Sequence, residues 1–302
     1  MMEQPAGHAL VEESLHEALN FRRAMRKVDE EFGDDDWWFK VWGPDHLADE
    51  GVGTRDDWVL EPKAYWHDFG HLAKDFNMLD PIKATVVTPG LDVEGNFADI
   101  GIPASIVTKY LAEHGVIVEK TGLYSFFIMF TIGITKGRWN TLVTELQQFK
   151  DHFDKNQPLW KVLPEFVAKH PRYERVGLQE ISAQIHSFYK SRDVARMTTE
   201  MYLSNMEPAM IPADAWSKMA HKDIDRVPID ELEGRVTAML VTPYPPGIPL
   251  LIPGERFNKS IVDYLRFARD FNQQFPGFET DIHGLVKNAE GNNGYYVDCV
   301  RT

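Results

Sequence analysis

Apolar side chains recur every three or four residues from the beginning of the sequence, which is the spacing of one face of an α-helix. The first such stretch runs from Leu10 to Phe32 and predicts a long amphipathic helix. A second begins at Pro103, which suits the first turn of a helix, and ends near Gly115, which suits a carboxyl end. The same spacing predicts further helices over residues 136–153, 178–190, 193–204 and 258–274, and another that opens at Pro212.

Short runs of β-branched and aromatic residues alternate with these helices and predict strands. The longest apolar run, Tyr124–Thr135, has about half the length of a membrane-spanning helix, so we interpret it as a buried strand. The segment Pro243–Pro249 holds four prolines in seven positions, which remove backbone donors and argue against regular structure. Other strands are expected over residues 37–42, 83–88, 116–119, 226–229, 235–242 and 295–300.

The order of these elements predicts the fold class. Strand, helix, strand, strand and helix follow one another in the first half, which indicates an α/β or α+β arrangement of one sheet covered by helices. A linker is expected over residues 154–164, where two prolines coincide with a change in charge density. The length of 302 residues allows one large domain or two ordinary ones, and with this linker the order of elements predicts two domains of similar size.

Composition narrows the class of protein. With 43% apolar and 26% charged residues, the sequence is typical of a folded, soluble protein. The net charge of −14 repels phosphate backbones and anionic membrane surfaces, so we expect no nucleic acid and no membrane as partner. No signal peptide is recognisable, and the single cysteine, Cys299, allows no intramolecular disulfide. We therefore expect a cytoplasmic protein.

Two groups of residues raise the question of a metal site. The acidic run Asp29–Asp36 is interpreted as a solvated helix end and loop, with a divalent cation site as the alternative. His67 and His71 lie four positions apart, as zinc ligands on one helix face do, but Gly70 and its polar neighbours indicate a turn. We therefore expect no metal. The sequence also lacks an HExxH motif, a GxSxG motif, a P-loop and a Rossmann glycine fingerprint.

A series of short motifs is more specific. They are Trp38–Trp42, Asp80–Lys83, Thr88–Gly90, Gly101–Ala104, Val118–Gly122, Ile132–Ile134, Pro243–Pro249, Pro253–Glu255 and Pro276–Gly284. In this order they resemble the carboxyl-terminal portion of the prokaryotic lysine/arginine/ornithine decarboxylases. These are large pyridoxal-phosphate enzymes of the aspartate-aminotransferase fold, and the resemblance covers essentially the whole chain.

The resemblance implies an architecture and a cofactor. Residues 1–156 correspond to the aminotransferase-like small subdomain, and residues 157–302 to an α+β carboxyl-terminal domain. In the family, the lysine that forms the Schiff base with pyridoxal phosphate follows a Ser-x-His pattern upstream of everything matched here. Lys222 alone follows a histidine, and we interpret it as a surface residue. We therefore expect the catalytic residues and most of the cofactor site outside these residues, and the chain alone to be inactive.

Glu119 is the one site residue that the resemblance assigns within the chain. In the lysine and ornithine members, the glutamate of this Glu-Lys-Thr-Gly stretch lies near the entrance of the active site, where a fixed carboxylate suits the substrate's distal ammonium group. The alternative is a structural salt bridge or an exposed charge at a strand end. As the acid-induced arginine decarboxylases lack this Glu-Lys pair, the resemblance favours lysine as the substrate, followed by ornithine.

The resemblance also bears on partners and regulation. Family members are homodimers that often assemble into decamers, so we expect a homo-oligomer. Some lysine decarboxylases bind a regulatory nucleotide through an arginine that precedes an Ile-Gln-Glu-Leu stretch, and Gly177 stands at that place here, which argues against such regulation. The alternative function is a catalytically inert binding or assembly module derived from such an enzyme.

Overall fold

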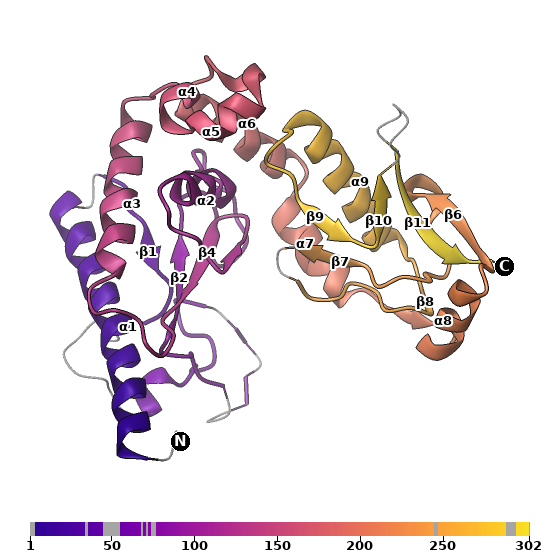
Figure 1. The fold of residues 1–302 in the computed structure, drawn as a ribbon, viewed down its shortest axis with the longest axis horizontal. Coiled ribbons are helices and arrows are strands. Elements are labelled where there is room, and N and C mark those ends of the chain that lie inside the picture. The colour runs from indigo at the N-terminus through magenta and orange to yellow at the C-terminus, as the bar shows by residue number, and fades with distance from the viewer. Residues whose placement is uncertain are drawn as a thin grey trace. The chain divides into compact units, whose positions relative to one another are not determined.

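The computed structural model describes residues 4–33, 36–44, 55–67, 69, 70, 72, 73, 77–244, 247–287 and 294–301. The chain divides into two compact units, residues 1–186 and 187–302. Each unit combines helices with small antiparallel sheets (Figure 1). The mixed helix-and-strand class that the sequence predicts is therefore confirmed. Within the described ranges, every helix is too short or too polar to cross a membrane.

The first unit is built on one four-stranded antiparallel sheet. Its order is β1 (Lys40–Val41), β2 (Lys83–Val87), β4 (Ser125–Met129) and β3 (Lys120–Thr121). Helix α3 (Trp139–Asp154) packs against both α1 (Pro5–Phe32) and α2 (Ala104–Glu113). Helix α1 also contacts β1 and β2, α2 also contacts β3 and β4, and a short 3-10 helix spans Arg55–Trp58. The core lies between the sheet and the helices and includes Phe21, Phe126 and Phe149, which are all fully buried.

Helix α1 is held by both its apolar stripe and a buried carboxylate. Ala18, Phe21 and Met25 follow helical spacing and are buried. Glu17, on the same side, accepts hydrogen bonds from the backbone N–H of Gly137 at 2.5 Å and from the indole of Trp139 at 3.0 Å. Glu17 thereby ties α1 to the turn that begins α3.

The segment after residue 156 packs onto the first unit. It contains α4 (Leu159–Val162), α5 (Pro164–Lys169), a 3-10 helix over Pro171–Tyr173 and the start of α6 (Leu178–Ser191). Glu113 accepts hydrogen bonds from the first backbone N–H groups of α5, and His186 of α6 bonds the Tyr124 hydroxyl at 2.6 Å. Because of these contacts, the compact division falls after residue 186, whereas the domain boundary expected from the sequence lies after residue 156.

The second unit surrounds α9 (Lys259–Gln274) and a three-stranded sheet of order β10 (Leu285–Lys287), β11 (Tyr295–Val300) and β6 (Ile224–Pro228). Helix α9 begins at the N-cap Asn258, whose side chain accepts from the Ile261 N–H, and buries Phe267 and Phe271. The other elements of the second unit are α7 (Val194–Leu203), β5 (Glu207–Pro208), α8 (Pro212–Ala220), a 3-10 helix (Ile229–Glu231), β7 (Thr242–Tyr244), β8 (Glu255–Arg256) and β9 (Asp281–His283).

Several strand predictions were too long or wrong. Residues 116–119 form no strand, and within 235–242 only Thr242 belongs to one, although both segments are rich in β-branched residues. Val236 and Val241 are buried and make only isolated β-bridges. These apolar residues therefore pack in the core without belonging to a continuous strand. The opposite error occurred at Pro243, for which the sequence predicted no regular structure. Pro243 pairs with Ile282 in the two-stranded sheet β7–β9, where a proline can face the open edge.

Candidate functional site

Glu119 lies directly before β3, the outer strand of the sheet on the side away from β1. Its side chain is exposed, and its backbone N–H donates to the carbonyl oxygen of Phe127 at 2.8 Å. The described residues form no ion pair with it. Two alternatives to a substrate contact were considered, a structural salt bridge and an exposed charge at a strand end. The described residues show no salt bridge, and the position of Glu119 agrees with an exposed charge beside a strand.

The residues after Glu119 form a tight turn into β4. The Gly122 N–H donates to the Ser125 carbonyl oxygen at 2.6 Å, and a Cβ on Gly122 would come within 2.9 Å of the Ser125 hydroxyl. Thr121 donates from its hydroxyl to that of Thr108 on α2 at 3.2 Å. The Glu-Lys-Thr-Gly stretch is thus held by backbone pairing, by the turn at Gly122 and by a contact to a helix, and this fixes the backbone from which Glu119 projects.

A cofactor that forms a Schiff base needs an unprotonated lysine amine. Of the lysines in the described ranges, Lys150 alone is fully buried, and it lies 2.8 Å from Asp36 and 2.7 Å from Asp154. Burial lowers the pKa of Lys150, but hydrogen bonds to these two carboxylates outweigh it and raise the pKa above its ordinary value. Lys222 is exposed at the carboxyl end of α8. Neither lysine fits pyridoxal phosphate.

The groups considered for metal binding do not assemble within the part of the chain that the structure describes, where no three metal-ligating side chains cluster. His67 is buried and its Nδ1 accepts from the Phe69 N–H at 2.9 Å. His71 lies outside the described residues. Asp36 of the acidic run bonds Lys150, and Asp34 and Asp35 also lie outside.

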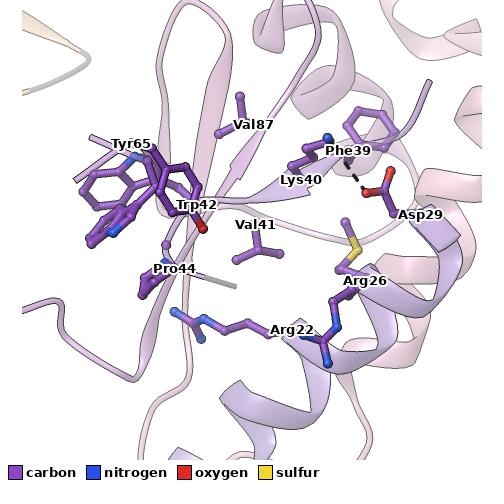
Figure 2. Close-up of a pocket in the computed structure, with 13 residues that line it drawn as sticks. Arg22, Arg26, Asp29, Phe39, Lys40, Val41, Trp42, Pro44, Tyr65 and Val87 are labelled. Carbon is purple, nitrogen blue, oxygen red and sulfur yellow. Dashed lines mark ion pairs between the residues drawn. The ribbon is translucent and has the colours of Figure 1, made fainter. Parts of the chain in front are cut away.

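The structure reveals a pocket that the sequence did not predict, between α1 and the segment that contains β1 (Figure 2). Its volume is about 430 Å³. Arg22 and Arg26 reach it from α1, while Lys40, Trp42 and Tyr65 lie on the other side. The sequence contained one indication of this pocket, because Arg22 falls inside the apolar stripe of the first predicted helix. A charged side chain at a buried position is costly unless polar groups surround it.

A second pocket, of about 620 Å³, adjoins the first and shares Asp29, Lys40 and Val87 with it. Its lining carries the carboxylates of Glu30 and Asp36. The Lys40 ammonium lies 4.0 Å from Asp29, so this ion pair stands where the two pockets meet. Both pockets lie at the β1 edge of the sheet, and Glu119 lines neither of them.

Comparison with known proteins gives consistent results over the whole chain. Residues 1–138 match the family model "Orn/Lys/Arg decarboxylase, major domain", and residues 195–301 match "Orn/Lys/Arg decarboxylase, C-terminal domain". The chain is 49% identical to the protein "Lysine decarboxylase LdcA" of Pseudomonas aeruginosa, a match that covers 100% of this chain and 41% of that protein. It is 37% identical to the inducible lysine decarboxylase of Escherichia coli K12, covering 96% of this chain and 40% of that protein.

A solved structure shows the same fold. The structure of lysine decarboxylase A from Pseudomonas aeruginosa superposes with a TM-score of 0.94 at 48% identity, over 100% of this chain and 41% of that one. Other relatives are named arginine and ornithine decarboxylases. The chain thus spans about two fifths of the length of the relatives that it matches.

Proposed function

Because the chain belongs to the Orn/Lys/Arg decarboxylase family, we propose that it is the carboxyl-terminal portion of a pyridoxal-phosphate-dependent enzyme that converts lysine to cadaverine and carbon dioxide. The main support is the similarity, over the whole chain, to proteins named lysine decarboxylase. Ornithine and arginine are the alternative substrates, since relatives are named for both. In this proposal residues 1–156 are the small subdomain, residues 157–302 are the carboxyl-terminal domain, and the complete enzyme is a cytoplasmic homo-oligomer.

Within this enzyme we assign Glu119 to the distal ammonium group of the substrate. Its exposed carboxylate has no cation partner among the described residues, and its backbone is fixed by the bond to Phe127 and the turn at Gly122. In a cleft from which water is partly excluded, such a carboxylate accepts charge-assisted hydrogen bonds from an ammonium group and disfavours neutral side chains.

The assignment of Glu119 is tested in the complete enzyme by Glu119→Gln. The expected result is a KM for lysine that rises about tenfold, the weight of one charge-assisted hydrogen bond, with a smaller change in kcat. Glu61→Gln, which removes an exposed carboxylate from another loop, is the matched control and leaves KM unchanged. An unchanged KM in Glu119→Gln would show that Glu119 does not contact the substrate.

The cofactor is proposed to bind outside these 302 residues. Support comes from Lys150 and Lys222, neither of which suits a Schiff base. The chain mixed with pyridoxal phosphate and then treated with borohydride is expected to show no lysine adduct in its intact mass. A stoichiometric adduct would contradict the proposal.

The second candidate function is an inert binding or assembly module. Its support is that neither Lys150 nor Lys222 suits a Schiff base. Reading the DNA upstream of the codon for Met1 separates the two. An open frame that encodes a Ser-x-His-Lys sequence supports the enzyme, and a start signal without such a frame supports the module.

A further inference from the structure

Helices α2 and α3 of the first unit meet around the ring of Tyr110, which is fully buried. The Tyr110 hydroxyl donates to Glu145 of α3 at 3.0 Å. The centroid of its ring lies 4.1 Å from that of His114, at the carboxyl end of α2, and 6.1 Å from that of His152 on α3. Two imidazoles, one from each helix, thus flank the same buried ring.

His152 also lies where α3 leads into α4 (Figure 1). Its carbonyl oxygen accepts from the Gln157 N–H at 2.9 Å, and the side-chain oxygen of Gln157 accepts from the Lys161 ammonium of α4 at 3.3 Å. Leu159 and Val162 anchor α4 by burial. A charge on His152 therefore acts on α4 as well as on α2.

The charged groups around His152 are mostly cations. Lys161 acts on it from α4, His114 from α2 when that imidazole is protonated, and Lys155 from the residue after α3. Asp151, its neighbour in the chain, opposes them. Because Asp151 and Lys155 pair with each other at 3.6 Å, their effects on His152 largely cancel. The repulsion from Lys161 and His114 remains.

His114 has different surroundings. Its Nε2 lies 4.0 Å from the same Glu145 oxygen that accepts from Tyr110. An imidazolium at His114 is therefore stabilised by a carboxylate, whereas an imidazolium at His152 is repelled by its neighbours. In acid His114 adds a second positive charge that faces His152.

The pKa of His152 agrees with this arrangement. Burial is the largest cause that lowers it below its ordinary value of 6.5, followed by Lys161, and His114 and Lys155 lower it further while Asp151 raises it. The folded chain thus binds this proton less readily than the unfolded chain. The stability that the neutral imidazole contributes is complete above about pH 6.5 and is lost as the pH falls toward the folded pKa.

We propose that protonation of His152 loosens α4 from the first unit, so that this junction of three helices responds to acid. The neutral imidazole packs beside Tyr110 and leaves α4 in place. The imidazolium is repelled by His114 and Lys161, and the beginning of α4 opens. All of these residues belong to one compact unit, and the proposal does not depend on the function proposed for the complete enzyme.

The direct test is amide hydrogen exchange in the full chain at about pH 7.5 and about pH 5.5. The reporters are the N–H groups of Val162 and Leu163, which donate to the carbonyl oxygens of Pro158 and Leu159 at 3.3 and 2.8 Å. Their rates are expressed as protection factors, because the exchange of an open amide itself depends on pH. Protection is expected to fall at least about twofold at the lower pH. Equal protection at the two pH values would overturn the proposal.

Variants assign the effect to one imidazole. His152→Gln keeps a polar side chain that cannot be protonated in this range, so the fall in α4 protection is expected to disappear. His8→Gln removes an exposed imidazole from α1 and is expected to keep the full effect. A fall in His152→Gln as large as that in the unaltered chain would contradict the proposal.

A titration of the His152 imidazole by NMR needs no change at His152 itself. Its midpoint in the unaltered chain is expected to lie below 6.5 and to move upward in Lys161→Gln, because that variant removes a facing cation. Lys169→Gln removes an exposed lysine from α5 and is expected to leave the midpoint in place. A midpoint at or above 6.5, or one that Lys161→Gln moves no more than Lys169→Gln, would contradict the proposal.

Discussion

Glu17, Arg22 and Lys150 are charged side chains that lie almost completely buried in the first unit. Glu17 accepts hydrogen bonds from two N–H donors, Arg22 donates to backbone carbonyl oxygens through its two terminal nitrogens, and Lys150 donates to two carboxylates. A buried charge without partners is costly, so each of these residues holds together the segments that supply its partners.

Glu17→Ala is expected to lower the free energy of unfolding by about 1–3 kcal/mol, because the N–H of Gly137 and the indole of Trp139 lose a buried acceptor. Urea unfolding measures this change. Glu12→Ala removes an exposed carboxylate from the same helix and is expected to have little effect. Equal losses in the two variants would mean that the Glu17 contacts do not stabilise the fold.

Lys150→Met is expected to change how stability depends on pH. The hydrogen bond from Lys150 is the largest cause that lowers the pKa of Asp36 below 3.8, followed by the Trp37 N–H. Because the folded pKa is depressed, Asp36 contributes stability that is present above pH 3.8 and is lost as the pH falls through the folded pKa.

The free energy of unfolding of Lys150→Met is therefore expected to fall less than that of the unaltered chain between about pH 5 and about pH 2. Urea unfolding at several pH values measures the difference. Lys155→Met removes an exposed lysine from the same region and keeps the full acid dependence. Parallel curves for Lys150→Met and the unaltered chain would contradict this account.

Among the elements, helices were predicted more closely than strands. Helix periodicity placed α9 and α3 to within a few residues, because each buries one stripe along its whole length. Strand composition failed at Ile117, which is 79% exposed and has no partner strand, and at Val236, which is buried without a ladder. Pairing depends on distant segments, so residue type alone cannot place it.

The candidate site was also predicted only in part from the sequence. The sequence placed Glu119 at the end of a strand predicted over residues 116–119, whereas it lies directly before β3, and the pocket beside Arg22 was not predicted at all. That pocket depends on how α1 lies against β1, and the contact between these elements is not encoded in any local pattern. A basic residue inside an apolar stripe was the one available signal.

Helix α5 provides a test at the scale of one element. It is six residues long and its first free N–H groups, those of Glu165 and Phe166, are capped by Glu113 from the end of α2 at 3.1 and 2.7 Å. Glu113→Ala is expected to cost about 1 kcal/mol in unfolding free energy and to speed amide exchange in α5. Glu174→Ala, which removes an exposed carboxylate beyond α5, is the control. Unchanged exchange in Glu113→Ala would contradict the capping role.

At the scale of the whole molecule, the described residues leave several large apolar side chains exposed. Ile100 is 73% exposed, Ile117 79% and Leu203 80%. Because exposed apolar groups favour association, we expect the isolated chain to self-associate, and sedimentation velocity measures it. A single sharp monomer boundary at all concentrations would contradict this expectation.

The central proposal is that this chain is the carboxyl-terminal portion of a lysine decarboxylase and is inactive alone. The most direct measurement is the release of carbon dioxide from lysine by the isolated chain, and by a fusion in which the chain replaces the matching two fifths of the Pseudomonas aeruginosa relative. The account predicts no release by the chain alone and release from lysine, in preference to ornithine and arginine, by the fusion. Release by the chain alone, or no release by a fusion that folds and binds pyridoxal phosphate, would contradict it.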